Sequence, residues 1–372
     1  MLKQISFLIL CAVAIVLFTA PVQACTSAVV SGKVTPDGRP LLWKNRDTDF
    51  MRNHIDYVKG EKYNFIAVVN SANAYLKEAW MGTNSSGFAL MNTQSYNLVD
   101  VKGDEERGAA NGRVIYRALE VCATVEDFCH FLDTISKPSD IEANFGVIDA
   151  QGGAAMFEVD YHKYVMYDAN NPKDAPYGYI ARTNFSFAGK VNEGAGYVRY
   201  MEADQVLMKA SATGSITPQS IFNDLSRSFR NRMLDIDLRS GAYNRPQASG
   251  WFVDQDFIPR SSTSCSVVVQ GVKPGEKAEL TTMWTLLGYP PTGIAVPLWV
   301  KDAGKLLPGM VRFGKEHEAA PLSDWSLRLA DRVFSYKQGM GTGRYLNWER
   351  LYSPETVSYT HLRAHETTLH LV

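Results

Sequence analysis

The chain has few cysteines for a protein of its length, only five among 372 residues. That number is too small for a disulfide scaffold, and the spacing fits no zinc site. Neither charge is in excess, since 38 Lys and Arg stand against 39 Asp and Glu, so nothing favours nucleic acid or another polyanion as a partner. Beyond one segment near the amino end, the sequence has no apolar run long enough to span a membrane, no repeats and no linker.

What is present is the composition of an ordinary globular enzyme, with 45% hydrophobic and 21% charged residues. The length fits one large domain or two closely packed ones. Cys122 and Cys129 could pair in an oxidising compartment, but two unpaired thiols is the simpler interpretation. His365, Glu366 and His370 do not have the spacing of a zinc-protease motif. We therefore predict no metal and no cofactor.

The segment near the amino end has the features of a secretory leader. Lys3 precedes an apolar run over residues 5–20, and a Val-x-Ala ending follows directly before Cys25. This pattern fits a cleaved leader better than a membrane anchor, which needs roughly 20 apolar residues. We expect residues 1–24 to be removed, so that the mature protein begins at Cys25. It would then be exported to a periplasm or the cell exterior, without stable membrane insertion.

An Ala-Cys ending has a second use, lipoprotein processing, in which lipid alkylates the cysteine sulfur and anchors the protein. Lipoprotein signals usually carry Leu three residues and a small residue two residues before the cysteine, where this chain has Val22 and Gln23. The two uses exclude each other chemically, because a sulfur that carries lipid is not a nucleophile. A lipid-anchored, non-catalytic surface protein of the outer membrane therefore stays open as the alternative.

A cysteine at the start of a mature chain carries a thiol and a free α-amine on one residue. The reference pKa of an α-amine is near 8, so the amine can take a proton at neutral pH. The thiol would attack an amide carbonyl, the amine would pass the thiol proton to the leaving amine, and water would cleave the thioester. This chemistry needs no histidine base, and His54, His130 and His162 are isolated in the sequence.

The spacing of apolar residues and turn signals predicts a mixture of antiparallel sheet and helices. The main domain is expected to cover residues 25–356, because residues 357–372 lack any period and read as a non-native or disordered tail. A turn at residues 84–87 separates two strands, and Thr124 with Asp127 predicts a helix cap. Strands are predicted at 26–30, 41–44, 65–70, 144–149, 154–160, 164–167, 179–182, 264–272, 280–287 and 294–300, and helices at 113–123, after Thr124, at 197–209, after Thr217 and at 327–336.

The residues after Cys25 resemble the start of the cysteine amino-terminal-nucleophile hydrolases. Cys25 and Thr26 stand at a strand start, and after a turn and one more strand comes Arg46-Asp47-Thr48-Asp49-Phe50, which matches the family's Arg-x-x-Asp-Phe pattern. The group includes choloylglycine (bile salt) hydrolases, penicillin V acylases, acid-ceramidase-like amidases and acyl-coenzyme A:6-aminopenicillanic acid acyltransferases. The resemblance implies that Arg46 supports the thiolate and Asp49 holds the α-amine, as a cation and a carboxylate would. Asp47 stays open as the alternative carboxylate.

Two later segments extend the resemblance. Residues 80–88 are similar to the family's Gly-x-Asn-x-x-Gly-Leu turn, after which a strand brings an amide or a tyrosine to the oxyanion hole. Counting along that strand gives Gln94, with Asn92 as the near alternative. Thr183 and Asn184 resemble the family's Thr-Asn pair, whose asparagine also serves the oxyanion hole.

Arg199 corresponds to the family's later active-site arginine, although a second alignment places Gly196 there. The implied fold is α+β, a four-layer αββα sandwich of two stacked antiparallel sheets between helical layers. The implied function is hydrolysis of a linear carbon–nitrogen amide bond in a small N-acyl compound, with acyl transfer through the same thioester as a variant. The acyl and amine groups, and whether the chain forms a homo-oligomer, stay open.

Overall fold

The computed structural model describes residues 24–99, 110–240, 250–337 and 344–352. The predicted leader, apart from Ala24, and the predicted tail at residues 357–372 lie outside these residues. No helix in the described part of the chain combines the length and the apolar character needed to cross a membrane.

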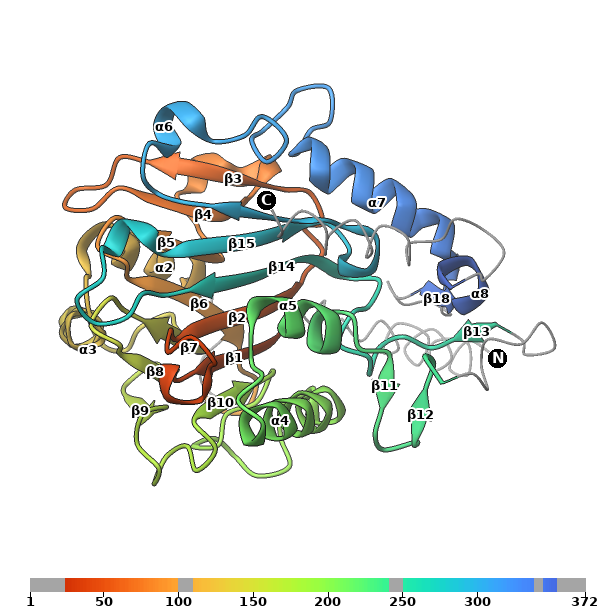
Figure 1. Cartoon of the computed structure of the whole chain (residues 1–372), viewed down its shortest axis with the longest axis horizontal. Coiled ribbons are helices and arrows are strands. Elements are labelled where there is room, and N and C mark those ends of the chain that lie inside the picture. Colours follow the sequence, from red (N-terminus) through yellow and green to blue (C-terminus); the bar gives the residue numbers. More distant parts are fainter. Residues whose placement is uncertain (1–23, 100–109, 241–249, 338–343, 353–372) are drawn as a thin grey trace, which may run out of the picture.

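Two large antiparallel sheets form the centre of the molecule (Figure 1). The first sheet has six strands in the order β10-β1-β2-β14-β15-β16, and the second has seven in the order β3-β4-β5-β6-β7-β8-β9. The first sheet contains β10 (Tyr179–Arg182), β1 (Thr26–Val30), β2 (Leu41–Asp47), β14 (Thr263–Gln270), β15 (Thr282–Leu287) and β16 (Ala295–Leu298). The second contains β3 (Asn53–Val58), β4 (Phe65–Asn70), β5 (Met81–Asn84), β6 (Ala89–Gln94), β7 (Ala143–Ile148), β8 (Ala154–Val159) and β9 (Tyr164–Asp168).

Two small sheets accompany the large ones, with strand orders β11-β12 and β13-β18-β17. Their strands are β11 (Arg230–Asn231), β12 (Ile236–Asp237), β13 (Trp251–Phe252), β17 (Phe334–Lys337) and β18 (Arg344–Asn347). The α-helices are α2 (Asn111–Val121), α3 (Val125–Thr134), α4 (Tyr197–Ala212), α5 (Pro218–Ser220), α6 (Ala303–Leu306), α7 (Pro321–Val333) and α8 (Trp348–Leu351). A π-helical segment, η3 (Ile221–Ser226), continues α5, and short 3-10 turns are η1 (Gly32–Val34), η2 (Ser71–Leu76), η4 (Ala278–Leu280) and η5 (Pro290–Thr292).

Three apolar clusters define the layers of the molecule. One lies between the large sheets, where Val29, Leu42 and Val267 of the first sheet pack with Met91 and Ile148 of the second. A second lies between the second sheet and helices α2 and α3, and a third lies between the first sheet and helices α4 and η3. Figure 1 shows α2 and α3 beside the strands of the second sheet and α4 beside β10. The predicted four-layer αββα arrangement is confirmed.

Local sequence explains why the central strands form where they do. All five residues of β1 and seven of the eight in β14 are buried, as expected for β-branched strands that are covered on both faces. Between β5 and β6, Gly87 has a φ of +81°, a left-handed conformation that favours glycine. The Asn84 side chain fixes this turn by accepting from the backbone of Ser86 and Phe88 and by donating to the end of α2.

Most predicted elements are present, and the differences are local. The predicted capping box of Thr124 and Asp127 begins α3. The last long helix begins earlier than expected, at Pro321, and ends at Val333, after which the chain forms β17 instead of helix. The described cysteines, including Cys122 and Cys129, are free thiols.

Candidate active site

Cys25 lies directly before β1, at one end of the first sheet. The side chain is buried, and its Sγ lies 3.8 Å from the backbone oxygen of Asp47. Thr26 pairs with Asn45 of β2, which in turn pairs with Ser266 of β14. The register therefore places Cys25 in one row across the sheet with Arg46 and Cys265, which are themselves paired.

Two side chains hold the main chain of Cys25. Its backbone nitrogen donates to Asn184 Oδ1 at 2.9 Å, and its backbone oxygen accepts from Arg199 Nη1 at 2.6 Å. Arg199 Nη2 also donates to Asn184 Oδ1 at 3.0 Å, which connects the two residues to each other. Three predicted site residues that are far apart in the sequence therefore meet at one point.

The elements that carry these side chains explain their positions. Asn184 follows β10, the strand next to β1, and its backbone is fixed by a bridge to Ala195. Arg199 lies in the first turn of α4, and burial lowers its pKa to about 10, so it stays protonated at neutral pH. Gly196, the second alignment's choice, is the residue before this helix and has a φ of +88°. A side chain there would collide with the Arg199 guanidinium, so Gly196 serves to make room for that group.

Arg46 points away from Cys25's main chain and into the space between the sheets. Its Nη1 donates to Asn53 Oδ1 at 2.6 Å, its Nη2 donates to Asn70 Oδ1 at 2.8 Å, and its guanidinium lies 4.6 Å from the ring centre of Trp80. Both hydrogen-bond acceptors are neutral. The Cys25 thiol and Arg46 are close enough for their charges to act on one another.

Of the two candidate carboxylates, the structure places Asp47 at the site and leaves Asp49 outside it. Asp47 is the last residue of β2 and is buried, whereas Asp49 follows the end of the strand and is exposed to solvent. Asp47 accepts from Thr263 Oγ1 at 2.5 Å and from Arg260 Nε at 2.7 Å. Arg260 Nη2 also lies 3.4 Å from the backbone oxygen of Ala24. Arg260 thus connects the Asp47 carboxylate to the peptide bond that precedes Cys25.

The Gln94 side chain is engaged away from Cys25. The Gln94 side chain accepts from Asn111 Nδ2 of α2 at 2.6 Å, so it is turned towards the helix that covers the second sheet. Only its backbone oxygen takes part in the site, as the acceptor for Asn184 Nδ2 at 2.8 Å. Asn92, the near alternative, accepts from Lys44 Nζ and serves a different group.

Tyr96, two residues beyond Gln94, is a further side chain near Cys25 that the sequence analysis did not name. Burial raises its pKa, and the charges on Cys25, Arg260 and Arg199 are close enough to influence it. The raised pKa keeps the phenol protonated and able to donate a hydrogen bond. The resemblance allows a tyrosine as well as an amide at this point, and Tyr96 follows two residues after β6 ends at Gln94.

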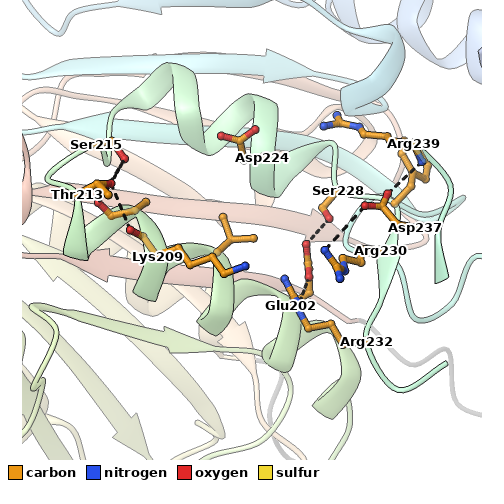
Figure 2. A pocket seen from close by; sticks show the side chains of 13 residues that line it. Glu202, Lys209, Thr213, Ser215, Asp224, Ser228, Arg230, Arg232, Asp237 and Arg239 are labelled. Atoms are coloured by element: carbon orange, nitrogen blue, oxygen red, sulfur yellow. Dashed lines mark hydrogen bonds and ion pairs between the residues drawn. The ribbon is translucent and has the colours of Figure 1, made fainter. Parts of the chain in front are cut away.

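A separate pocket of about 420 Å³ lies between α4 and the β11-β12 pair (Figure 2). Its charged groups are engaged with one another: Glu202 pairs with Arg232 at 2.6 Å and accepts from Ser228 Oγ at 2.6 Å. None of the predicted site residues lines it. The pocket is therefore distinct from the site around Cys25.

Comparison with solved structures finds distant likenesses to amide hydrolases. A mutant conjugated bile acid hydrolase from Clostridium perfringens is 12% identical, with a TM-score of 0.44, over 75% of this chain and 93% of that one. Penicillin V acylase from Agrobacterium tumefaciens is 16% identical, with a TM-score of 0.39, over 74% and 86%. The Caenorhabditis elegans N-acylethanolamine-hydrolyzing acid amidase ortholog is 15% identical, with a TM-score of 0.40, over 54% and 89%. No curated protein matches the sequence.

A family model gives the assignment. The model described as acyl-coenzyme A:6-aminopenicillanic acid acyl-transferase matches residues 34–222, slightly more than half of the chain. The match includes Arg46, Asn184 and Arg199 and begins after Cys25. This chain therefore belongs to the acyl-coenzyme A:6-aminopenicillanic acid acyl-transferase family, within the N-terminal-nucleophile group of enzymes that act on amides.

Proposed function

We propose that this enzyme hydrolyses a linear carbon–nitrogen amide bond in a small N-acyl compound, with Cys25 as the nucleophile after residues 1–24 are removed. The observation that carries the proposal is the environment of Cys25, whose backbone nitrogen, backbone oxygen and sulfur each have a defined partner. A cysteine exposed at the surface would not have a fixed partner for each of these three groups. The candidate substrates are bile-salt conjugates, penicillin-type amides and N-acyl amines or lipids.

The proposed reaction uses both groups of the first residue. The Cys25 thiol gives its proton to the α-amine, and the sulfur forms a bond to the amide carbonyl. When the tetrahedral intermediate collapses, the carbon–nitrogen bond breaks and the α-amine returns the proton to the leaving amine. Water then cleaves the thioester and releases the acid. The α-amine becomes available only when the bond between Ala24 and Cys25 has been cut.

The neighbouring residues divide the remaining tasks in this proposal. Asn184 and Arg199 fix the position of Cys25, and Arg46 supports the thiolate. Asp47 orients the α-amine in place of Asp49. Tyr96 donates to the oxyanion in place of Gln94, because a protonated phenol near the thiol is a suitable donor.

The first experiment is the intact mass of the protein exported by a secretory host, before and after reaction with a thiol probe. A chain that begins at an unmodified Cys25 and gains one probe on that residue supports the proposal, and Cys25→Ser serves as the control. A diacylglycerol adduct on Cys25, or an uncut leader, would instead favour the lipid-anchored surface protein. The same measurement tests the proposed export to a periplasm or the cell exterior.

The second experiment measures release of the amine from a panel of N-acyl compounds. Cys25→Ala should abolish turnover, whereas Cys122→Ala, which alters a buried thiol against the α2 and α3 layer, should change only stability. Turnover that survives in Cys25→Ala would refute the assignment of the nucleophile.

Acyl transfer is the second candidate, because the matching family is named for an acyl-transferase. Both reactions share the thioester, so they differ only in what cleaves it. Addition of a free amine such as 6-aminopenicillanic acid distinguishes them. A new amide product would show transfer, and release of the free acid at an unchanged rate would show hydrolysis.

A further inference from the structure

Lys44 is a buried lysine that the proposed reaction does not use. It lies in β2, two residues before Arg46, and only 2% of its surface is exposed. Its cross-strand neighbours are Ser27 and Val267, and Val267 belongs to the core between the two sheets. The Lys44 ammonium therefore lies inside the sandwich, at the level of the strand ends that carry Cys25 and Arg46.

The hydrogen-bond partners of Lys44 are all neutral. Its Nζ donates to the backbone oxygen of Trp80 at 3.0 Å and to Asn92 Oδ1 at 2.9 Å. Arg46 likewise bonds to the neutral amides of Asn53 and Asn70. Within the described ranges of the chain, neither cation forms an ion pair with a carboxylate. Burying two like charges without an anion is costly, and such arrangements cluster at functional sites.

Three groups near Lys44 can carry negative charge: Cys25, Cys265 and Asp47. Burial raises the pKa of the Cys265 thiol, so that thiol stays uncharged at neutral pH. The Asp47 carboxylate is engaged with Arg260 and Thr263. The second sheet contributes only the neutral Trp80 and Asn92 partners to the Lys44 ammonium. Glu78 also lies near Arg46, but its carboxylate pairs with Arg113 at 3.8 Å. The remaining anion that this pair of cations would stabilise is the thiolate of Cys25.

We propose that Lys44 is a positioning residue of the nucleophile site, a second cation that, together with Arg46, favours the thiolate form of Cys25. The α-amine still takes the thiol proton, and Lys44 keeps its own throughout. Burial lowers the pKa of Lys44 to about 8, so the ammonium carries its charge at neutral pH and loses it in mildly alkaline solution. The proposal deepens the proposed function but concerns the free thiol, so its test needs no substrate.

The test measures the rate at which iodoacetamide alkylates Cys25 between pH 5 and 10, with the modified peptide quantified by mass spectrometry. Lys44→Gln removes the charge but retains a side-chain donor. Loss of one buried cation near a thiol should move the midpoint of the alkylation profile up by about one pH unit, which is roughly a tenfold slower reaction below the midpoint. Lys44→Arg, which keeps a charge, should recover part of the shift.

Two controls separate charge from packing. Lys33→Gln removes the same charge from an exposed lysine and should leave the midpoint unchanged. Val267→Ala disturbs the cross-strand neighbour of Lys44 without altering charge, and it too should leave the midpoint in place. A folded Lys44→Gln protein with the wild-type midpoint would overturn the proposal.

Asn92→Asp keeps the test decisive if Lys44→Gln does not fold. Asn92→Asp is read together with Asn92→Asp/Lys44→Gln: if Lys44 carries the effect, its loss should shift the midpoint upwards in this background as well, whereas equal midpoints for the single and double variants overturn the proposal. The outcomes are separable from those for the proposed function. A shifted midpoint in a protein without amidase activity would support the role of Lys44 and refute only the substrate assignment.

Discussion

At the residue scale, the end of one strand decides which charged side chain belongs to the site. Asp47 is the last residue of β2 and is buried beside Cys25, whereas Asp49 lies beyond the strand in solvent. The two carboxylates are only two residues apart, and a sequence pattern alone does not show where the strand stops. The same reason applies to Gln94 and Tyr96. Strand β6 ends at Gln94, so a sequence pattern alone does not show which of the two side chains lies nearer to Cys25.

Asp47→Asn should reduce both activity and stability, while Asp49→Asn should alter neither. Removing one partner of a buried ion pair costs roughly 3–5 kcal/mol, and the nearly buried Arg260 would lose its carboxylate. An exposed substitution stays within about 0.5 kcal/mol. Urea unfolding and amine release measure the two effects. Equal effects of the two variants would contradict the reassignment to Asp47.

Tyr96→Phe should lower kcat by about 100-fold or more and leave KM nearly unchanged, because an oxyanion donor acts in the transition state. Gln94→Leu should lose only its hydrogen bonds with Asn111 and with the backbone oxygen of Ser95, a stability effect of about 1 kcal/mol. Steady-state kinetics on any substrate identified by amine release provides the measurement. A larger loss of kcat in Gln94→Leu than in Tyr96→Phe would instead favour Gln94, the residue expected from the sequence, as the oxyanion donor.

At the element scale, a buried ion pair ties the two large sheets together next to the site. Arg182, the last residue of β10, pairs with Glu158 of β8 at 2.6 Å, and both side chains are almost fully buried. Glu158 also accepts from the backbone nitrogens of Phe187 and Ala188. The Arg182 guanidinium lies 3.8 Å from the ring centre of Phe187. These contacts fix the segment that carries Asn184.

Glu158→Ala should therefore destabilise the protein by roughly 3–5 kcal/mol, because Arg182 would remain buried without a partner. The matched control is Glu61→Ala, which breaks an exposed pair with Arg117 and should cost about 0–1 kcal/mol. Both values come from urea unfolding at neutral pH. A Glu158→Ala protein no less stable than the Glu61→Ala protein would show that this pair does not fasten the sheets.

Sequence patterns located most of these strands and helices. The strands that they did not predict depend on pairing with other segments of the chain. Strands β1, β4 and β10 have the predicted bounds, since their residues are apolar and turns flank them. The edge strand β3 was not predicted, because it is rich in polar residues and its pairing with β4 determines its conformation. The small sheet β13-β18-β17 joins segments far apart in the sequence, which no local pattern reveals.

At the scale of the whole molecule, the stacking of the sheets creates a polar region inside an apolar core. Strands β2 and β6 face each other, so Lys44 of the first sheet reaches Asn92 of the second. The charge of Lys44 has a cost in stability that depends on pH. Burial lowers its pKa in the folded protein to about 8 from its ordinary value of 10.5.

Between about pH 8 and 10.5 the unfolded chain holds a proton on Lys44 that the folded chain has released. The free energy of unfolding should therefore rise with pH in this window, through this residue, and the contribution of Lys44 should become independent of pH below about pH 8. Comparing wild type with Lys44→Gln in urea at pH 7, 8 and 9 isolates the contribution. A difference between the two proteins that is constant with pH would contradict the prediction.

By itself, the sequence determined the family and the general architecture of this protein, and it pointed to one candidate nucleophile. A cysteine after an apolar segment, the order of the motifs and the alternation of apolar residues are local properties, and they suffice for the candidate nucleophile Cys25, the family and the two-sheet fold. The tertiary structure decided which polar side chains surround Cys25. Asp47, Tyr96, Arg260 and Lys44 lie near it because strands end, pair and stack at particular positions, and burial of a charge depends on segments that are distant in the sequence.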